Sequence, residues 1–273
     1  MAYEIIDSHV HFWEPEHPDR PWHKGGVDLG PPLSVERLLE DAREAGVSKI
    51  LQVTPSIMGW DNRYGVEGSQ RYSERVIGVI GRFDPVAPQM PRRLAEVAAH
   101  AKILGVRITL IKEWTSWLRD GLLEPFLKEA GRLGMRVQIY GPDQPREIHD
   151  AARRHPQTVF LVDHMTLDHH NPEPFAQWSE VLAMADSPNV YVKASYFPEV
   201  SKQPFPFTDV VPYLRSLYER FGADRIIWGS NYPPSARACS YKENVDFMRE
   251  QGFLSTDDRT KIFGATLLRV LGL

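Results

Sequence analysis

The chain has 273 residues, of which 42% are hydrophobic and 25% charged, a balance typical of globular proteins. Its formal net charge of −4 argues against nonspecific nucleic-acid binding, which needs clustered positive charge. The single cysteine excludes an intrachain disulfide and favours a reducing compartment, so we expect a cytoplasmic protein. No basic segment precedes an apolar core at the N-terminus, and no apolar run approaches ~18 residues, so we expect neither a signal peptide nor a membrane span.

The first predicted element is a short strand at residues 5–10, which runs into two histidines, His9 and His11. Residues two apart in a strand lie on one face, so both imidazoles are expected to point the same way, with Asp7 behind them. Two imidazoles placed in this way suit a metal ion or proton transfer near neutral pH. The alternative is one buried, hydrogen-bonded histidine and one surface histidine.

Short apolar runs then alternate with longer amphipathic patterns along the rest of the chain. The runs predicted as strands are residues 5–10, 49–53, 76–81, 106–110, 136–139, 158–162, 190–194 and 225–228. The patterns predicted as helices are residues 34–46, 61–73, 91–104, 122–133, 144–155, 172–185 and 209–221, with two more that begin at Lys242 and Thr256. Residues 17–32 are rich in Pro and Gly and predict a loop. Aromatic residues in and around this loop, Trp13, Trp22 and His23, could roof a pocket.

Eight strands, each followed by a helix, predict an α/β protein formed by a single (β/α)8 TIM barrel over residues 1–273. Most of the strands are apolar and β-branched, as expected where both faces of a parallel sheet are covered. Active sites in this fold lie at the C-terminal ends of the strands. The candidate site residues at these ends are His9, His11, Ser56, Arg107, Tyr140, His164, Lys193, Tyr196 and Asn231.

Five of these residues are candidates for substrate binding. Arg107 carries the guanidinium fork that suits a substrate carboxylate, although it could instead be a salt-bridged barrel residue. Lys193 lies inside a strand, which is costly unless its charge is paired and therefore favours a site role. Tyr140 and Tyr196 either line the pocket or pack. Ser56 is expected to be a pocket or turn residue and not a nucleophile, because no G-x-S-x-G elbow surrounds it.

Six segments at the strand ends are, in chain order, IDSHVHFW, LQVTPSIMGWDN, GVRI, VDHM, YVKAS and GSNYP. Together they resemble the amidohydrolase superfamily and, within it, the amidohydrolase-related branch that contains 2-pyrone-4,6-dicarboxylate lactonase and sugar lactonases. The resemblance covers nearly the full chain and implies a hydrolase that acts on a ring ester, an amide or a similar bond. It also implies that His9, His11, His164 and Asn231 surround the reacting carbon.

The same resemblance bears on cofactors. Many members hold a divalent metal such as zinc on these residues, with a further ligand, usually His, on strand five. The pyrone lactonase type lacks that ligand and works without metal. Here strand five reads VQIYG, and imidazoles without an anionic ligand form a weak zinc site. We therefore expect no cofactor; if a metal is present, His9, His11 and His164 would hold it.

Asn231 is the second departure, because it stands in GSN where the family carries GSD. An amide cannot accept a proton and is a poor zinc ligand. If the Asp is the family's general base, this chain lacks it. Three explanations stay open: the Asn was introduced deliberately to trap a ligand, another base such as His164 or His11 acts, or the chain has left hydrolysis for another reaction or for binding.

The sequence thus predicts a hydrolase that opens a small, anionic cyclic ester. The three histidines would polarise the carbonyl and hold the oxyanion, and water would attack from the side of residue 231. Arg107, Lys193 and Tyr140 would hold the substrate. The alternatives are a metal-dependent decarboxylase or hydratase of the same superfamily, and a catalytically silent barrel that binds a small molecule. We expect no nucleic-acid or membrane partner, and a homo-oligomer stays open.

Overall fold

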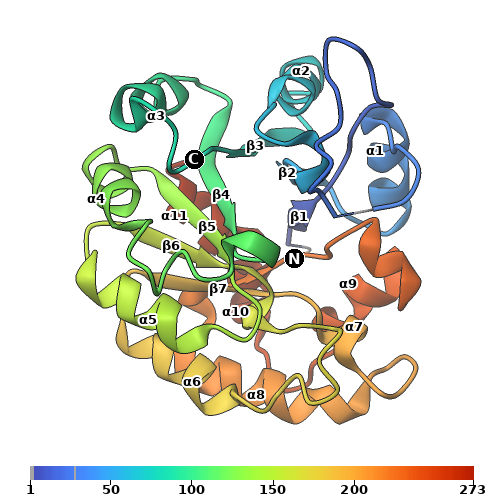
Figure 1. The fold of residues 1–273 in the computed structure, drawn as a ribbon. Coiled ribbons are helices and arrows are strands. Elements are labelled where there is room, and N and C mark those ends of the chain that lie inside the picture. Colours follow the sequence, from blue (N-terminus) through green and yellow to red (C-terminus); the bar gives the residue numbers. More distant parts are fainter. Residues whose placement is uncertain (1–2, 28) are drawn as a thin grey trace.

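The strands form one parallel sheet that curls into a nearly closed barrel (Figure 1). The computed structural model describes residues 3–27 and 29–273, and within these ranges the sheet has eight strands in the order β1 to β8. They are β1 (Ile6–Val10), β2 (Lys49–Val53), β3 (Val76–Arg82), β4 (Ile103–Thr109), β5 (Arg136–Tyr140), β6 (Val159–Val162), β7 (Val190–Ala194) and β8 (Ile226–Trp228). The predicted (β/α)8 barrel is confirmed. The predicted loop at residues 17–32 includes residue 28, which lies outside the described residues.

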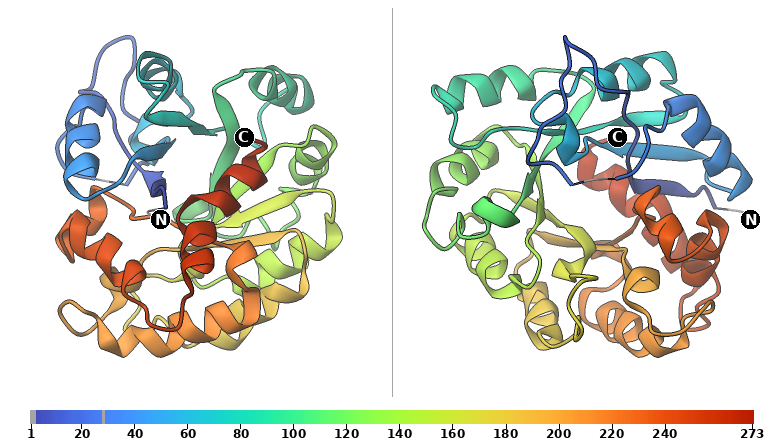
Figure 2. Two further views of the ribbon diagram at one scale, coloured as in Figure 1. Left: turned by 180° about the vertical axis from the view of Figure 1, so that it is seen from behind. Right: turned by 45° about the vertical axis from the view of Figure 1, so that its right-hand side comes forward.

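Helices surround the strands on the outside of the barrel (Figure 2). They are α1 (Val35–Glu44), α2 (Arg63–Arg71), α3 (Met90–Ala98), α4 (Glu124–Arg132), α5 (Pro145–Arg154), α6 (Trp178–Ala183), α7 (Phe197–Val200), α8 (Val211–Phe221), α9 (Tyr241–Arg249), α10 (Thr256–Thr260) and α11 (Thr266–Leu271). Local sequence explains their starts: the Ser34 side chain accepts from the Arg37 backbone at the start of α1, and Ser240 forms a capping box with Glu243 in α9.

Two predicted helices are wrong at one end, and one short helix was not predicted. The helix predicted at residues 91–104 ends at Ala98, because β4 begins at Ile103. The helix predicted at residues 172–185 begins only at Trp178, and residues 172–177 form bends and turns. Turn hydrogen bonds hold this stretch instead, such as the one that the Ala176 N–H donates to the Glu173 carbonyl. The unpredicted helix is α7, which follows β7.

Backbone hydrogen bonds just beyond β1 and β8 close the seam of the barrel. The Asn231 N–H donates to the His9 carbonyl at 2.9 Å, and the His11 N–H donates to the Tyr232 carbonyl at 2.8 Å. These bonds extend the parallel pairing of the sheet across its two edge strands. The seam therefore fixes His9, His11 and Asn231 relative to one another through the main chain.

Asp7 strengthens the same seam. One of its carboxylate oxygens accepts from the backbone N–H groups of His9 and Ser230, at 2.9 and 3.0 Å. The other accepts from the Tyr241 hydroxyl of α9 at 2.6 Å. A fully buried carboxylate with this many donors is satisfied within the protein, so Asp7 serves structure.

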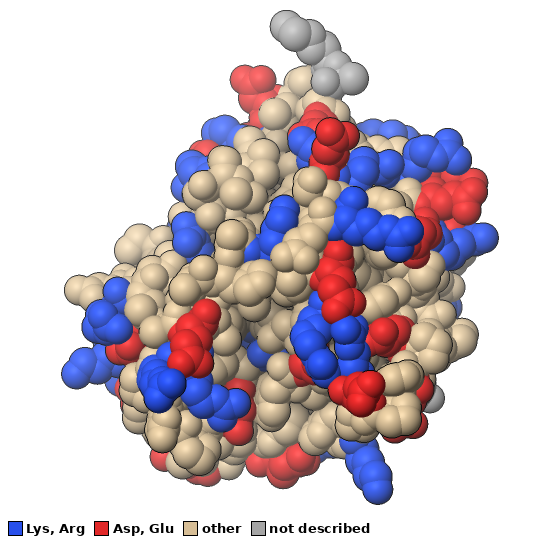
Figure 3. Space-filling view, turned by 90° about the horizontal axis from the view of Figure 1, so that it is seen from above, with Lys and Arg blue, Asp and Glu red and all other residues tan. Residues whose placement is uncertain are grey.

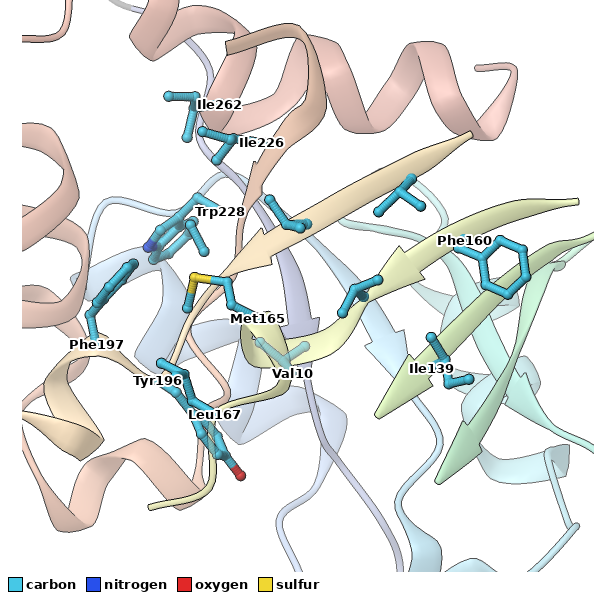
Figure 4. Packing of buried hydrophobic residues seen from close by; sticks show 14 of the residues in the cluster. Val10, Ile139, Phe160, Met165, Leu167, Tyr196, Phe197, Ile226, Trp228 and Ile262 are labelled. Carbon is cyan, nitrogen blue, oxygen red and sulfur yellow. The ribbon is translucent and has the colours of Figure 1, made fainter. Parts of the chain in front are cut away.

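Apolar side chains fill the layer between strands and helices (Figure 4). Trp228 of β8, Phe197 of α7 and Met165 after β6 are buried in this layer, together with Leu167 and Tyr196. Burial of a large apolar side chain stabilises by about 1.5–3 kcal/mol. The segments after β6 and β7 are therefore anchored from below, which gives the polar groups at their tips fixed positions.

A second apolar cluster closes one end of the barrel interior. Its buried members come from the strands and from α11: Ile6, Leu51, Val53, Ile80, Leu161, Ile227, Leu267, Val270 and Leu271. The C-terminal helices, red in Figure 2, cross this end of the barrel. With that end closed by hydrocarbon, the polar side chains of the strands gather at the opposite end.

The surface carries charges of both signs. On the face shown in Figure 3, Lys and Arg lie among Asp and Glu without a broad patch of one sign. In the described part of the chain, none of the helices has the length and apolar character needed to cross a lipid bilayer.

Candidate active site

A cavity of about 390 Å³ opens at the C-terminal ends of the strands. Its lining residues follow strand after strand around the barrel, as expected for an active site in this fold. They are His11, Val27, Leu29, Pro55, Ser56, Arg107, Thr109, Ile111, Tyr140, His164, His169, His170, Tyr196, Glu199, Asn231, Pro234, Arg237 and Ala238. Seven of the nine predicted site residues line this cavity, and the other two, His9 and Lys193, lie beneath its surface with no exposed area.

The three predicted histidines form one cluster. The ring centroid of His9 lies 5.0 Å from that of His11 and 4.6 Å from that of His164. His9 is fully buried, whereas His11 and His164 reach the cavity. Strand pairing and the seam place these rings side by side, although His9 and His164 are distant in the sequence.

His11 is held in one tautomer by the main chain. Its Nδ1 lies 2.7 Å from the Val53 carbonyl oxygen, which only accepts, so Nδ1 carries the proton. Burial and the nearby Arg107 guanidinium lower the pKa of His11 to about 3, so the ring is neutral at pH 7. Its Nε2 therefore presents a lone pair and not a donor.

His164 lies on a constrained turn after β6. His164, Met165 and Thr166 have φ angles of 55°, 52° and 61°, a left-handed conformation that non-glycine residues rarely adopt in succession. The His164 ring stacks on Tyr196 with centroids 3.7 Å apart, and its Nδ1 lies 2.7 Å from the Ser195 hydroxyl oxygen. Burial, together with His9, holds the pKa of His164 well below its usual range.

Asp163 is the centre of a buried polar network beneath the cavity. Its Oδ2 accepts from Arg107 Nε at 2.8 Å and from Gln138 Nε2 at 3.0 Å. Its Oδ1 lies 3.2 Å from His9 Nδ1, at an angle too poor for a hydrogen bond, and 3.8 Å from Lys193 Nζ. The network thus joins groups from β1, β4, β5 and β7 with Asp163, directly after β6, under the floor of the cavity.

Lys193 does not reach the cavity as the sequence suggested, because the network holds it below. Its Nζ donates to Gln138 Oε1 at 2.6 Å and to the Ser8 carbonyl at 2.8 Å. Burial lowers the pKa of Lys193 to about 8, although Asp163 opposes this shift. Burial alone would raise the pKa of Asp163, but Arg107 and Lys193 outweigh it and hold that pKa below its usual value.

The walls of the cavity combine aromatic and loop residues. The Tyr140 hydroxyl donates to the Leu167 carbonyl at 3.3 Å, and the Tyr140 and Tyr196 rings meet edge to face. The Ser56 hydroxyl accepts from the Val27 backbone at 2.9 Å and so secures the predicted loop over the cavity. This loop contributes Val27 and Leu29, and not the aromatic residues that the sequence suggested as a roof.

The rim carries polar groups that the sequence analysis did not place in the site. His169, His170 and Arg237 are exposed and line the cavity. His169 and His170 follow the turn after β6, and Arg237 lies in the segment after β8. They add cationic or proton-binding groups at the entrance.

Glu199 is the site residue that the sequence reasoning missed. It lies in α7 and lines the cavity, where its Oε1 accepts from the Asn231 side-chain amide at 3.3 Å. The residue is partly exposed, but its Oε2 is buried and has no hydrogen-bond partner among the described residues. Burial raises the pKa of Glu199 to about 7, even though the Asn231 hydrogen bond lowers it. The available signal was an acidic residue five positions beyond a strand end, in YFPEV.

His9, Asp163 and His164 are a group that could hold a divalent metal. Their potential ligand atoms all lie within 4.8 Å of one another, and the His9 nitrogens hydrogen-bond to none of the described residues. The surrounding charge is less favourable. Asp163 is already paired with Arg107 and lies near Lys193, and two cations beside the cluster repel a further cation.

Comparisons with known proteins agree on one family. The model of the amidohydrolase family matches residues 6–273. The chain is 28% identical to L-fucono-1,5-lactonase of Burkholderia ambifaria, over 95% of this chain and 92% of that protein. It is 24% identical to 4-sulfomuconolactone hydrolase of Hydrogenophaga intermedia, over 84% of this chain and 74% of that protein.

The fold is shared with solved structures of low sequence identity. An amidohydrolase of Burkholderia multivorans with bound zinc has a TM-score of 0.82 at 20% identity, over 99% of both chains. That likeness concerns the arrangement of the barrel, whereas the family model covers the strand ends that carry the histidines and Asn231. The chain therefore belongs to the amidohydrolase family.

Proposed function

We propose that this chain hydrolyses a small cyclic ester, a lactone. The observation that carries the proposal is the cluster of neutral imidazoles, His9, His11 and His164, at a cavity that also contains the Arg107 guanidinium. Such a cavity offers hydrogen-bond donors and acceptors around one carbonyl group. The names of the two relatives, both enzymes that act on lactones, support the same class of substrate.

In the proposed reaction, Arg107 and His164 hold the carbonyl oxygen. Arg107 engages Asp163 through Nε, so its terminal nitrogens remain for the cavity that it lines. His164 presents an Nε2–H donor when the Ser195 hydroxyl donates to Nδ1, 2.7 Å away, and not to the more distant Lys193 carbonyl at 3.4 Å. Both groups stabilise the negative charge that builds on the oxygen as water attacks, and they are already in place before the reaction.

His11 has a different role from the one expected from the sequence. Its protonated Nδ1 is bound to the Val53 carbonyl, so Nε2 accepts and cannot polarise a carbonyl group. We assign Nε2 to hold one hydrogen of the attacking water. His9 has no exposed surface, so its role is to pack against the other two rings and Asp163.

The proposal includes no metal-dependent step. Arg107 supplies positive charge at the carbonyl oxygen, and the Asp163 carboxylate is already bound by Arg107 and Gln138.

We also propose that the substrate is anionic. Arg107 on the floor and Arg237 on the rim give the cavity its positive charge, while Tyr140 and Tyr196 offer aromatic walls for a ring.

A lactone panel tests the proposal. Sugar 1,5-lactones and carboxylate-bearing five-membered lactones, each with a neutral analogue, are followed by proton release. We expect hydrolysis of at least one anionic lactone, and a loss of about 10²–10³-fold in kcat for His164→Gln, the effect of removing one oxyanion donor. The exposed His100 provides the matched control, His100→Gln, which should keep wild-type turnover.

Other outcomes of the panel would contradict the proposal. Loss of carbon dioxide from aromatic carboxylic acids, with every lactone left intact, would identify a decarboxylase. Saturable binding of lactones without turnover would identify a binding protein.

A further inference from the structure

We infer that Glu199 is the general base of this site, the group that takes a proton from the attacking water. The inference rests on the proposed lactone hydrolysis and assigns the step that His9, His11, His164 and Asn231 leave open. It is carried by the position of the Glu199 carboxylate in the cavity and by its contact with Asn231.

The carboxylate is part of the same cavity as the groups that hold the substrate. Glu199 lies on α7, directly after β7, and Phe197 of the same helix is buried in the apolar layer. This anchoring fixes the direction of a side chain on a very short helix. Oε1 is bound by the Asn231 amide, and Oε2 is buried without a partner among residues 3–27 and 29–273. Because Oε2 has no exposed surface, the attacking water would meet the carboxylate at Oε1, beside the Asn231 amide, where Glu199 lines the cavity.

The contact also gives a reason for the amide at position 231. Two carboxylates at 3.3 Å could not both ionise, and one would retain a proton at neutral pH. Asn231 donates instead, which leaves Glu199 free to ionise. Asn is also suited to the left-handed backbone at this position, where φ is 60°.

Protonation chemistry favours Glu199 over His11, which also lines the cavity and could accept a proton from water. A base works best when its pKa lies near the working pH. The pKa of Glu199 is raised to about 7 by burial, whereas that of His11 is lowered to about 3, so His11 is a far weaker base. Several titratable or charged groups face Glu199 from its own helix start, from the segment after β8 and across the cavity: Tyr196, Cys239, Arg237, His11, His164 and Arg107.

The step balances without a further reactant. As the water oxygen forms a bond to the carbonyl carbon, one of its protons moves to Glu199, and the carbonyl π electrons move to the oxygen. The tetrahedral oxyanion then collapses and breaks the ring C–O bond. Protonated Glu199 returns its proton to the departing alkoxide, and the new carboxylic acid ionises in solvent.

The first variant removes only the basic oxygen. Glu199→Gln keeps the shape of the side chain and can still accept from Asn231 through its carbonyl. We expect kcat to fall by about 10²–10⁴-fold, the usual contribution of a general base, with little change in KM. The acidic limb of the pH–rate profile near pH 7 should disappear. Glu219→Gln, on an exposed part of α8, is the matched control and should keep both kcat and the limb.

The second variant transposes the pair. In Glu199→Gln/Asn231→Asp the carboxylate stands on the other side of the same hydrogen bond. We expect the kcat of this double variant to be at least tenfold higher than that of Glu199→Gln alone. Far-ultraviolet circular dichroism and thermal melting confirm that each variant is folded.

The outcomes separate the two proposals. If the wild-type protein opens a lactone and Glu199→Gln retains wild-type turnover and pH profile, the assignment of Glu199 is overturned and the lactonase proposal stands. If the wild-type protein opens no lactone, the lactonase proposal fails and this assignment fails with it. Loss of turnover in Glu199→Gln without recovery in the transposed variant supports a base at 199 that position 231 cannot replace.

Discussion

Asn231 and Glu199 share one hydrogen bond, so a change in either side chain alters the charge state of both. In Asn231→Asp, the new carboxylate would lie about as far from Glu199 as the present amide nitrogen, 3.3 Å. Like charges at this distance raise the pKa of one member of the pair. We expect the acidic limb of the pH–rate profile to move to higher pH and turnover at pH 7 to fall. Higher turnover at pH 7 would instead favour a base at position 231.

The raised pKa of Glu199 also predicts a pH dependence of stability. Its pKa rises from the ordinary 4.5 to about 7 on folding, so between these values the folded chain retains a proton that the unfolded chain has lost. The stabilisation that protonated Glu199 contributes to the folded state is fully present below pH 4.5 and is lost as the pH rises through about 7. The wild type loses this stabilisation as the pH rises, and Glu199→Gln does not. When the pH is raised from 5 to 8, the free energy of unfolding of Glu199→Gln should therefore increase by about 1–3 kcal/mol relative to that of the wild type.

Urea unfolding at the two pH values measures this difference. The exposed Glu219→Gln should show the same free energy relative to wild type at both. If the free energy of unfolding of Glu199→Gln relative to wild type is the same at pH 5 and pH 8, the Glu199 carboxylate is ionised in the folded chain throughout this range.

The sequence located the histidines and Asn231 because each follows an apolar run that pairs in the sheet. It could not locate Glu199, because a helix of four residues is too short to show an amphipathic period. It also misplaced Lys193. Strand alternation indicates the face on which a side chain lies, but not how deep it lies in a closed barrel, and Lys193 lies under the floor.

At the scale of elements, four strands depend on one buried charge pair. Arg107 of β4 and Asp163 after β6 pair directly, with β5 and β7 joined through Gln138 and Lys193. In Arg107→Met, Asp163 keeps its buried charge and loses its closest counter-charge. We expect the free energy of unfolding to fall by about 3–5 kcal/mol in chemical denaturation.

The rim arginine provides the control for this prediction. Arg237→Met removes an equal charge at an exposed position and should leave stability within about 0.5 kcal/mol of wild type. Its expected effect is on KM, which should rise for anionic lactones and not for their neutral analogues. Unchanged stability in Arg107→Met would show that the network contributes little to folding.

The strands were predictable because their apolar, β-branched runs are short and continuous, and a parallel sheet buries both faces. Helix ends were less predictable. The sequence after residue 98 remains compatible with a helix, yet β4 takes up residues from Ile103, because sheet pairing outweighs local preference. Helix starts are more local, because Ser34 and Ser240 cap α1 and α9 through side-chain hydrogen bonds within the first turn.

For the molecule as a whole, the charges beneath the cavity predict its metal content. Arg107 and Lys193 lie beside the cluster of His9, Asp163 and His164 and oppose a tightly held divalent ion. After purification without chelators, elemental analysis should find well under one zinc or manganese per chain. Near-stoichiometric metal, together with loss of activity on chelation, would contradict the proposed metal-free reaction.

The closed end of the barrel predicts where stability is most sensitive to truncation of a side chain. Leu267 of α11 is fully buried against the strands. Leu267→Ala should lower the free energy of unfolding by about 2–5 kcal/mol, the range for a buried leucine. Leu273→Ala, at an exposed position in the same segment, should have little effect. Equal effects of the two changes would show that α11 does not seal the barrel.

The seam between β1 and β8 has a consequence during synthesis on the ribosome. The partners that it joins, His9 with Asn231 and His11 with Tyr232, are separated by most of the chain. Until β8 emerges, the nascent β1 presents an unpaired edge, the kind of surface on which strands of other chains add. Release of a prematurely terminated product would therefore favour aggregation. The same order of events keeps the histidines and Asn231 apart until β8 has been translated, so the site can assemble only after β8 has left the ribosome.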